Sequence, residues 1–260
     1  MRPLFLALGI LVLACSGTSP RPMTTQTFSR YIALGDSISI DLYPAHDVER
    51  RYAGRASTSL LGAASLLYRN DDRLWPEFEG RDLRSLYKGI EFDNRTSDGA
   101  TTHTLLRQVE SVTASDEPTL VTVTIGGNDL LGVLGSRGGN PVPDIAERMR
   151  TAVTRVLERR PNATVLLSTV YDPSDGTNRL PGHGGTLDRE AEWLRQYQDE
   201  LRRFAATDKR LRLADIHAHF LGHGMKVAER DRWYLQESII EPNARGASEV
   251  RRVWLTALDR

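Results

Sequence analysis

Residues 120–129 of the chain read LVTVTIGGND. The first six residues are aliphatic or β-branched, which favours a β-strand, and the two glycines that follow favour a turn. Asn128 and Asp129 come directly after the turn, so polar side chains stand at the carboxyl end of this strand. We therefore expect residues 120–125 to form a strand and the residues after them to carry chemistry.

Strand-like and helix-like stretches alternate on either side of this strand. Further strands are expected at 31–34, 89–93, 163–170 and 210–214. Helices are expected at 56–68, 101–112, 143–160, 186–206 and 244–258. Alternation of this kind predicts an α/β fold, in which a parallel sheet carries helices on both faces. Ligands bind beyond the carboxyl ends of the strands in such sheets, so functional residues should follow the strands.

The amino-terminal residues differ from the rest of the chain. Residues 1–14 join a basic start to an apolar run over 4–13, which is typical of a secretory signal peptide and too short to span a bilayer. Cys15 follows small residues, as in a bacterial lipoprotein processing site, so we expect it to be lipidated after cleavage. Residues 15–28 are polar and rich in proline, serine and threonine, which predicts a flexible tether. Residues 29–260 then form one domain.

The charge of the chain argues against a nucleic-acid partner. The chain has 34 basic and 34 acidic residues and a formal net charge of zero, whereas nucleic-acid binding needs a clustered basic surface. Its single cysteine leaves no disulfide within the chain. We expect an exported monomer, anchored to the bacterial cell envelope through lipidated Cys15 on the periplasmic or outer-membrane side, or otherwise secreted.

Three segments with chemically useful residues each follow a predicted strand. Residues 35–37 read GDS, residues 94–101 read NRTSDGAT, and residues 126–129 read GGND. A serine held at an exposed turn can act as a nucleophile. A glycine lets the backbone approach a substrate closely, and an asparagine amide can donate to a developing oxyanion. The three segments together predict a site at one edge of the sheet.

These segments, in this order and at strand ends, resemble the first three sequence blocks of the SGNH/GDSL hydrolases, and residues 242–246 (PNARG) extend the resemblance. The resemblance implies a three-layer α/β/α sandwich around a flavodoxin-like, five-stranded parallel sheet. It also implies an ester hydrolase without a cofactor or metal, in which Ser37 is the nucleophile. The Ser37 N–H, the Gly99 N–H and the Asn128 side chain would then stabilise the oxyanion.

The expected base departs from the pattern of this family. The family's last block is Asp-x-x-His-Pro-Asn or close to it, whereas residues 238–243 read SIIEPN. Glu241 stands in place of the histidine and Ser238 in place of the aspartate, which Glu237 could replace in part. The pKa of an ordinary glutamate is about 4.3, against about 6.5 for histidine, and an apolar pocket would raise it. Glu241 is therefore either an unusual base or a sign of lost catalysis.

A histidine from another part of the chain could also serve as the base. Residues 215–223 read DIHAHFLGH and follow the last predicted strand. His223 is the preferred candidate, ahead of His217 and His219. The same histidines could instead be loop and packing residues, or could bind zinc together with Asp215.

The sequence leaves two functions open. The first is an ester hydrolase that acts on acyl or acetyl groups of a lipid, glycan or small ester. The second is a catalytically impaired binding protein of the cell envelope with the same fold. A nucleotide-binding protein is disfavoured, because the chain lacks a Gly-x-Gly-x-x-Gly loop that opens a helix. We further expect Asp41, Tyr43 and Pro44 to shape the entrance of the site, and residues 172–176 to line it.

Overall fold

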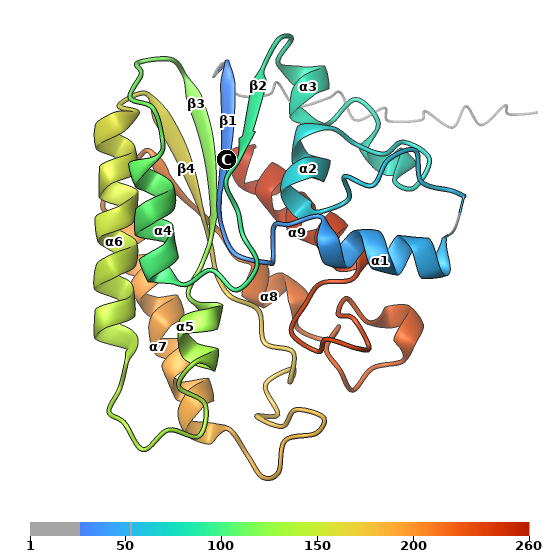
Figure 1. Ribbon diagram of the computed structural model, residues 1–260, viewed down its shortest axis with the longest axis vertical. Helices are drawn as coiled ribbons and strands as arrows, with labels where there is room; N and C mark the ends of the chain where they lie inside the picture. Colours follow the sequence, from blue (N-terminus) through green and yellow to red (C-terminus); the bar gives the residue numbers. More distant parts are fainter. Residues whose placement is uncertain (1–26, 53, 260) are drawn as a thin grey trace, which may run out of the picture.

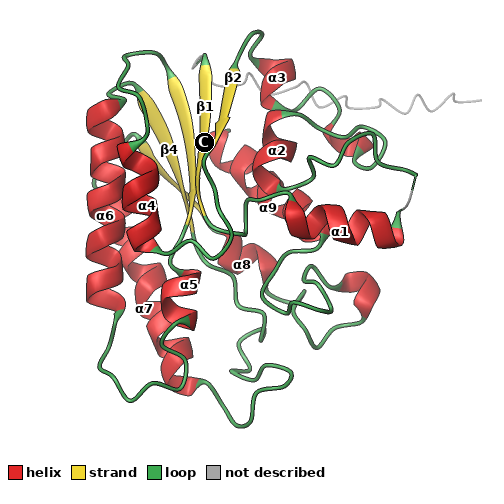
Figure 2. Ribbon diagram, viewed as in Figure 1, coloured by secondary structure: helices red, strands yellow, loops and turns green. Residues whose placement is uncertain are grey.

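The computed structural model describes residues 27–52 and 54–259. Five parallel strands form one sheet in the order β2-β1-β3-β4-β5 (Figures 1 and 2). The strands are β1 (Arg30–Gly35), β2 (Glu91–Asn94), β3 (Thr119–Thr124), β4 (Ala163–Ser168) and β5 (Leu211–Ala214). This is the flavodoxin-like strand order, so the predicted fold class is confirmed. The predicted signal peptide, Cys15 and most of the tether lie outside the described residues.

Helices cover both faces of the sheet and complete the three layers (Figure 1). One face carries α4 (Thr102–Glu110), α6 (Val142–Arg159) and α7 (Asp188–Ala205), and the other carries α2 (Ala63–Tyr68) and α9 (Ala244–Leu258). The shorter helices are α1 (Leu42–Arg51), α3 (Leu83–Leu86), α5 (Gly127–Leu131) and α8 (Ile216–Phe220), with 3-10 turns at Pro76–Phe78 and Glu229–Asp231. No helix in the described part of the chain is long and apolar enough to cross a bilayer.

Side-chain alternation along β1 joins the sheet to both helical layers. Tyr31 and Ala33 point into the core that includes α2 and α9, whereas Ile32 and Leu34 point into the core that includes α4, α6 and α7. All four side chains are fully buried. Burial of one large aliphatic side chain contributes about 1.5–3 kcal/mol. The end of β1, from which the first polar segment starts, is therefore fixed from both sides.

The helix predicted at 56–68 begins later than expected, and this prediction is corrected. Residues 56–62 are irregular, and α2 starts at Ala63. Gly62 is extended, and its N–H donates to the Asp41 carboxylate at 2.7 Å. Gly62 is thus the N-cap of α2, and its N–H is bonded outside the helix. Asp41, which we expected at the entrance of the site, thus anchors the start of α2.

Gly35, the last residue of β1, has a backbone conformation that side chains disfavour. Its φ is +120°, and a Cβ atom there would lie 1.9 Å from the Thr124 carbonyl oxygen. We expect Gly35→Ala to lower the free energy of unfolding by about 3 kcal/mol or more, because backbone strain and overlap add. Urea unfolding measures this change. Gly139→Ala, with no atom within 4 Å of the added methyl, should change it by less than about 0.5 kcal/mol. Equal losses in both variants would contradict the argument.

Candidate active site

One cavity of about 130 Å³ lies beyond the carboxyl ends of the strands. Ser37 follows β1, Asn128 lies in α5 directly after β3, and Glu241 precedes α9, and all three residues line this cavity. Asp172, which follows β4, lines it as expected from the sequence. The fold therefore brings together predicted site residues that are far apart in the chain.

A tight turn after β1 holds Ser37. The Asp36 N–H donates to the Thr124 carbonyl at 2.9 Å, and the Asp36 carboxyl accepts the Ile38 N–H at 3.2 Å. Ser37 is 5% exposed. Its own N–H has no hydrogen-bond partner among the residues that the structure describes. That backbone donor is therefore available to a substrate oxygen.

The loop after β2 brings Gly99 to the same edge of the sheet. The Ser97 N–H donates to the Gly35 carbonyl at 3.0 Å, which ties the loop to the end of β1. The Ala100 N–H donates to the Ser97 carbonyl at 3.3 Å and closes a turn. Gly99 lies in this turn with a φ of +66°, and its N–H is unpaired within the described residues. It offers a second backbone donor at this edge, but Gly99 is not among the residues that line the cavity.

Asn128 is held in the first turn of α5. Its Nδ2 donates to the Ala100 carbonyl at 3.0 Å, which uses one amide hydrogen and leaves the other available. The neighbouring Asp129 accepts the backbone N–H and the hydroxyl of Thr102 at 2.8 and 2.6 Å. These bonds fix α5 against the start of α4. The segment that carries Gly99 and the segment that carries Asn128 are thereby held in one arrangement.

Glu241 meets Ser37 in a buried environment. Glu241 is 4% exposed, it lines the cavity together with Ser37, and the Ser37 hydroxyl is near enough to affect the pKa of its carboxyl. Burial raises the pKa of Glu241 to about 7; the Ser37 hydroxyl acts against this rise, and the charge of Asp98 adds to it. The Oε2 atom of Glu241 has no hydrogen-bond partner among the described residues. Glu241 thus combines a place near the Ser37 hydroxyl with a pKa close to neutrality.

A second carboxyl, that of Asp36, is buried beside this pair. Burial raises the pKa of Asp36 to about 8, against the effect of hydrogen bonds from Ile38 and Thr124, and the charge of Glu241 raises it further. At neutral pH the Asp36 carboxyl is therefore mostly protonated. Of the two carboxyls, Asp36 and Glu241, it is then Glu241 that is substantially ionised at neutral pH.

Two further polar groups lie near Glu241. The Tyr43 hydroxyl donates to Asp98 Oδ2 at 3.1 Å. Burial, the bond to Asp98 and the charge of Glu241 raise the pKa of Tyr43 to about 12. Sequence reasoning missed Asp98, although its place beside the predicted oxyanion glycine was a usable signal. Glu237, the predicted substitute for the family's aspartate, instead forms an ion pair with Arg50.

His223, the predicted alternative base, is not among the residues that line the cavity. Its ring stacks on Trp233 with the ring centroids 3.6 Å apart, and its Nδ1 lies 2.8 Å from the Asp231 carbonyl oxygen. The backbone N–H of Trp233 donates to the His223 carbonyl at 3.0 Å. The segment after α8 thus folds back on itself, and His223 packs within it instead of approaching Ser37.

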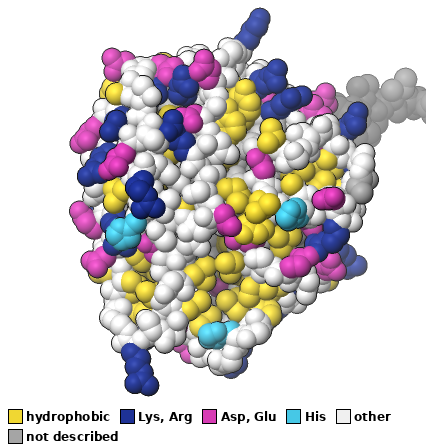
Figure 3. Space-filling model, in the orientation of Figure 1, with side chains coloured by type: hydrophobic (Ala, Val, Ile, Leu, Met, Phe, Trp, Pro, Cys, Tyr) yellow, Lys and Arg dark blue, Asp and Glu magenta, His cyan; other side chains and the backbone are white. Residues whose placement is uncertain are grey.

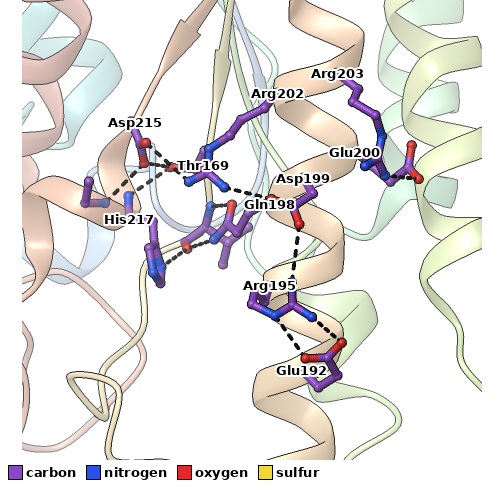
Figure 4. Close-up of polar contacts among 12 residues, drawn as sticks. Thr169, Glu192, Arg195, Gln198, Asp199, Glu200, Arg202, Arg203, Asp215 and His217 are labelled. Atoms are coloured by element: carbon purple, nitrogen blue, oxygen red, sulfur yellow. Dashed lines mark hydrogen bonds and ion pairs between the residues drawn. The ribbon is translucent and has the colours of Figure 1, made fainter.

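The other two histidines of this segment are also engaged elsewhere. Figure 4 shows His217 at the start of α8, where its Nδ1 lies 3.1 Å from the Val170 carbonyl oxygen. His219 Nε2 lies 2.9 Å from Glu249 Oε2. In the described part of the chain, no group of three His, Cys, Asp or Glu side chains is placed to hold a metal ion. The histidine segment therefore provides neither a base at Ser37 nor a described zinc site.

Most of the remaining cavity wall is apolar, and the sequence analysis did not identify it. The side chains come from α5, the residue stretch after it, the segment before α7, and α7 itself. We call them the leucine wall, which consists of Leu130, Leu131, Leu134, Leu180, Leu187, Ala191 and Leu194. Two adjacent leucines directly after the GGND segment were the one signal in the sequence.

The chain is similar to known proteins in sequence pattern and in fold. A family model described as the GDSL-like Lipase/Acylhydrolase family matches residues 33–248. None of the curated proteins matches the chain by sequence.

Three solved structures illustrate the likeness in fold. A catalytic mutant of an acetylxylan esterase from Geobacillus stearothermophilus has 17% identity and a TM-score of 0.61, with 91% of this chain and 96% of that chain covered. Phospholipase A1 from Streptomyces albidoflavus has 18% identity and a TM-score of 0.59, with 89% and 100% covered. An extracellular lipase from Streptomyces rimosus has 20% identity and a TM-score of 0.55, with 88% and 99% covered.

Proposed function

Because the chain belongs to the GDSL-like Lipase/Acylhydrolase family, we propose that it hydrolyses esters with Ser37 as the nucleophile and Glu241 as the general base. Membership of the family makes the chain a hydrolase that acts on ester bonds. The roles of the two residues are our proposal. The observation that supports them best is that Ser37 and buried Glu241, whose pKa is about 7, line the same cavity.

In the first step, Ser37 Oγ attacks the carbonyl carbon of the ester while Glu241 accepts the hydroxyl proton. A general base works best when its pKa lies near the working pH. An ordinary glutamate, with a pKa of about 4.3, would be a weak base at neutral pH. Burial brings Glu241 into the range in which histidine usually acts, so the replacement of the family's histidine is compatible with turnover.

The negative charge that develops on the carbonyl oxygen needs hydrogen-bond donors. The Ser37 N–H, the Gly99 N–H and the second Nδ2 hydrogen of Asn128 are the proposed donors. When histidine is the base, proton transfer leaves a cation beside the oxyanion, whereas protonation of Glu241 leaves a neutral acid. The fixed donors therefore carry more of the stabilisation in this chain than they would beside an imidazolium.

Collapse of the tetrahedral intermediate completes the first half of the reaction. The bond to the leaving oxygen breaks, and protonated Glu241 returns its proton to that oxygen, so the alcohol departs and Ser37 stays acylated. Water then attacks the acyl group while Glu241 accepts one of its protons. The second intermediate breaks down to the carboxylic acid, and the proton on Glu241 restores the Ser37 hydroxyl.

Replacing Asn128 with alanine is expected to lower kcat for ester hydrolysis by about a hundredfold to a thousandfold, because one preorganised oxyanion donor is lost. Steady-state hydrolysis of 4-nitrophenyl butyrate measures the change. Asn162→Ala is the matched control, since its amide donates to the Asp116 carbonyl on the surface. If Asn128→Ala keeps kcat within about threefold of the Asn162→Ala value, Asn128 is not an oxyanion donor.

A further inference from the structure

Part of the leucine wall comes from α7, which polar contacts hold in place. The Val170 N–H donates to Gln198 Oε1 at 3.2 Å, and the Gln198 side-chain amide donates back to the Val170 carbonyl (Figure 4). These bonds hold α7, which supplies part of the wall, against the end of β4. Apolar side chains also reach the surface on the lower half of the face that Figure 3 shows. The cavity beside Ser37 thus has an apolar wall.

The titratable Asp, Glu, Lys, Arg or His residues that line the cavity are all acidic. They are Asp36, Asp172, Glu190 and Glu241, and no Lys, Arg or His of the described chain lines it. An anionic group that enters the cavity would lose water without gaining a cation as a partner, which is costly in an apolar environment. An uncharged group pays no such penalty.

The position of Glu241 orients the substrate. Under the proposed function, protonated Glu241 must reach the leaving oxygen, so the alcohol part of the ester lies on the side of Glu241. The charge of Asp98 raises the pKa of Glu241, and the charge of Glu241 raises the pKa of Tyr43, so both polar groups lie on that side. The acyl part then extends the other way, past Asn128 and into the leucine wall.

We propose that the leucine wall binds the acyl chain of an uncharged ester, and that the chain is longer than acetyl. The inference rests on the proposed function. An engineered apolar cavity of about 150 Å³ holds a benzene molecule, and the cavity beside Ser37 measures about 130 Å³. An acyl chain of about six carbons, the number in benzene, is therefore a suitable length for the test.

Two isomeric esters test the assignment of the acyl side directly. Ethyl hexanoate and hexyl acetate contain the same atoms, but only the first carries the long chain on the carbonyl. We expect kcat/KM for ethyl hexanoate to exceed that for hexyl acetate by roughly tenfold or more. Titration of the released acid measures both rates. Equal values, or a preference for hexyl acetate, would overturn the proposal.

A charged chain tests the acidic lining. Ethyl hydrogen adipate differs from ethyl hexanoate by a carboxylate at the end of the acyl chain. We expect its kcat/KM to be lower by roughly tenfold or more, because the carboxylate finds no cation in the cavity. Equal turnover of the two esters would contradict the charge argument.

Filling the cavity should reverse the chain-length preference. Ala191 lines the cavity from α7. Ala191→Phe should therefore lower the ratio of ethyl hexanoate turnover to ethyl acetate turnover by roughly tenfold or more. Leu194→Trp provides a second filling variant in case the first does not fold. Ala206→Phe, at an exposed position just after α7, is the control and should leave the ratio unchanged. An unchanged ratio in both folded cavity variants would remove the leucine wall from acyl binding.

Calorimetry with the Ser37→Ala protein separates this inference from the proposed function. We expect ethyl hexanoate to bind that protein roughly tenfold or more tightly than ethyl acetate, since each buried methylene adds to binding. Tighter binding of hexanoate without any turnover by the unmodified protein would contradict the proposed function and keep the inference. Turnover by the unmodified protein, together with equal binding of both esters to the Ser37→Ala protein, would keep the proposed function and contradict the inference.

Discussion

Ser37→Ala is expected to lower kcat for 4-nitrophenyl butyrate by about ten-thousandfold to a millionfold, the largest effect of any single change in this protein. Alanine removes the hydroxyl that we propose as the nucleophile, while the proposed oxyanion donors at Gly99 and Asn128 remain. The residual rate should therefore come from oxyanion stabilisation and binding alone. Steady-state kinetics at high protein concentration measure it.

Ser111→Ala is the control for this change. Ser111 ends α4, and its hydroxyl donates to the Gln108 carbonyl at 2.7 Å. The control should retain kcat within about twofold, since surface substitutions of this kind rarely disturb a distant site. Turnover that survives in Ser37→Ala at the level of the control would show that the nucleophile lies elsewhere.

Glu241→Gln is expected to lower kcat/KM by about a thousandfold to ten-thousandfold, because glutamine has the same shape but cannot accept the Ser37 proton. The control is Glu237→Gln. The carboxylate of Glu237 pairs with Arg50 and its side chain is 56% exposed. The kcat/KM of this variant should stay within about twofold of the natural value, because exposed ion pairs contribute little. A loss of similar size in both variants would point to a general effect of negative charge.

The pH dependence of kcat/KM follows from the same carboxylate. Glu241 must be ionised to act, so kcat/KM should rise with pH, reach half its maximum near the Glu241 pKa of about 7 and level off above it. The negative charge of Asp98 raises that pKa. Asp98→Asn should therefore move the rising limb to lower pH. A limb near pH 4.3, the ordinary value for glutamate, would contradict the buried setting of this base.

Glu241→His distinguishes the enzyme from the binding protein that the sequence also allowed. In an active enzyme, histidine replaces one base by another of similar pKa, and turnover should survive in part. A natural protein without turnover that gains it through Glu241→His would instead be a binding protein on this fold. The raised pKa of Glu241 and its place beside Ser37 in the cavity favour the first outcome.

The sequence predicted the sheet well, and two of its three predicted polar segments, 35–37 and 126–129, contribute to the cavity lining, for a local reason. The run at 120–125 is nearly all β-branched, and the observed β3 covers Thr119–Thr124. Side chains buried on both faces leave a continuous apolar signal of this kind. Because strand ends meet at one edge in a parallel sheet, the placement of Ser37 and Asn128 at one cavity followed from the strand assignments.

The choice of base could not be made from the sequence, because it depends on the paths that long loops take through space. Glu241 and His223 both lie in the irregular segment between α8 and α9. Their positions are set by distant contacts, such as the stacking of His223 on Trp233. The contact of Asp98 with Tyr43 is equally non-local. The start of α2 was misjudged for the same reason, since the N–H of its N-cap Gly62 is bonded to the distant Asp41.

The rate at which a fluorophosphonate labels Ser37 tests the central claim most directly. The reagent forms a phosphorus–oxygen bond to the serine and releases fluoride, so it reports the nucleophile and its base without a substrate preference. We expect a single adduct at Ser37, formed at a rate that rises with pH through about 7. In Glu241→Gln the rate should fall by about a hundredfold or more and lose this pH dependence. An adduct on another residue, or an unchanged rate in Glu241→Gln, would contradict the assignment of Ser37 and Glu241 as a catalytic pair.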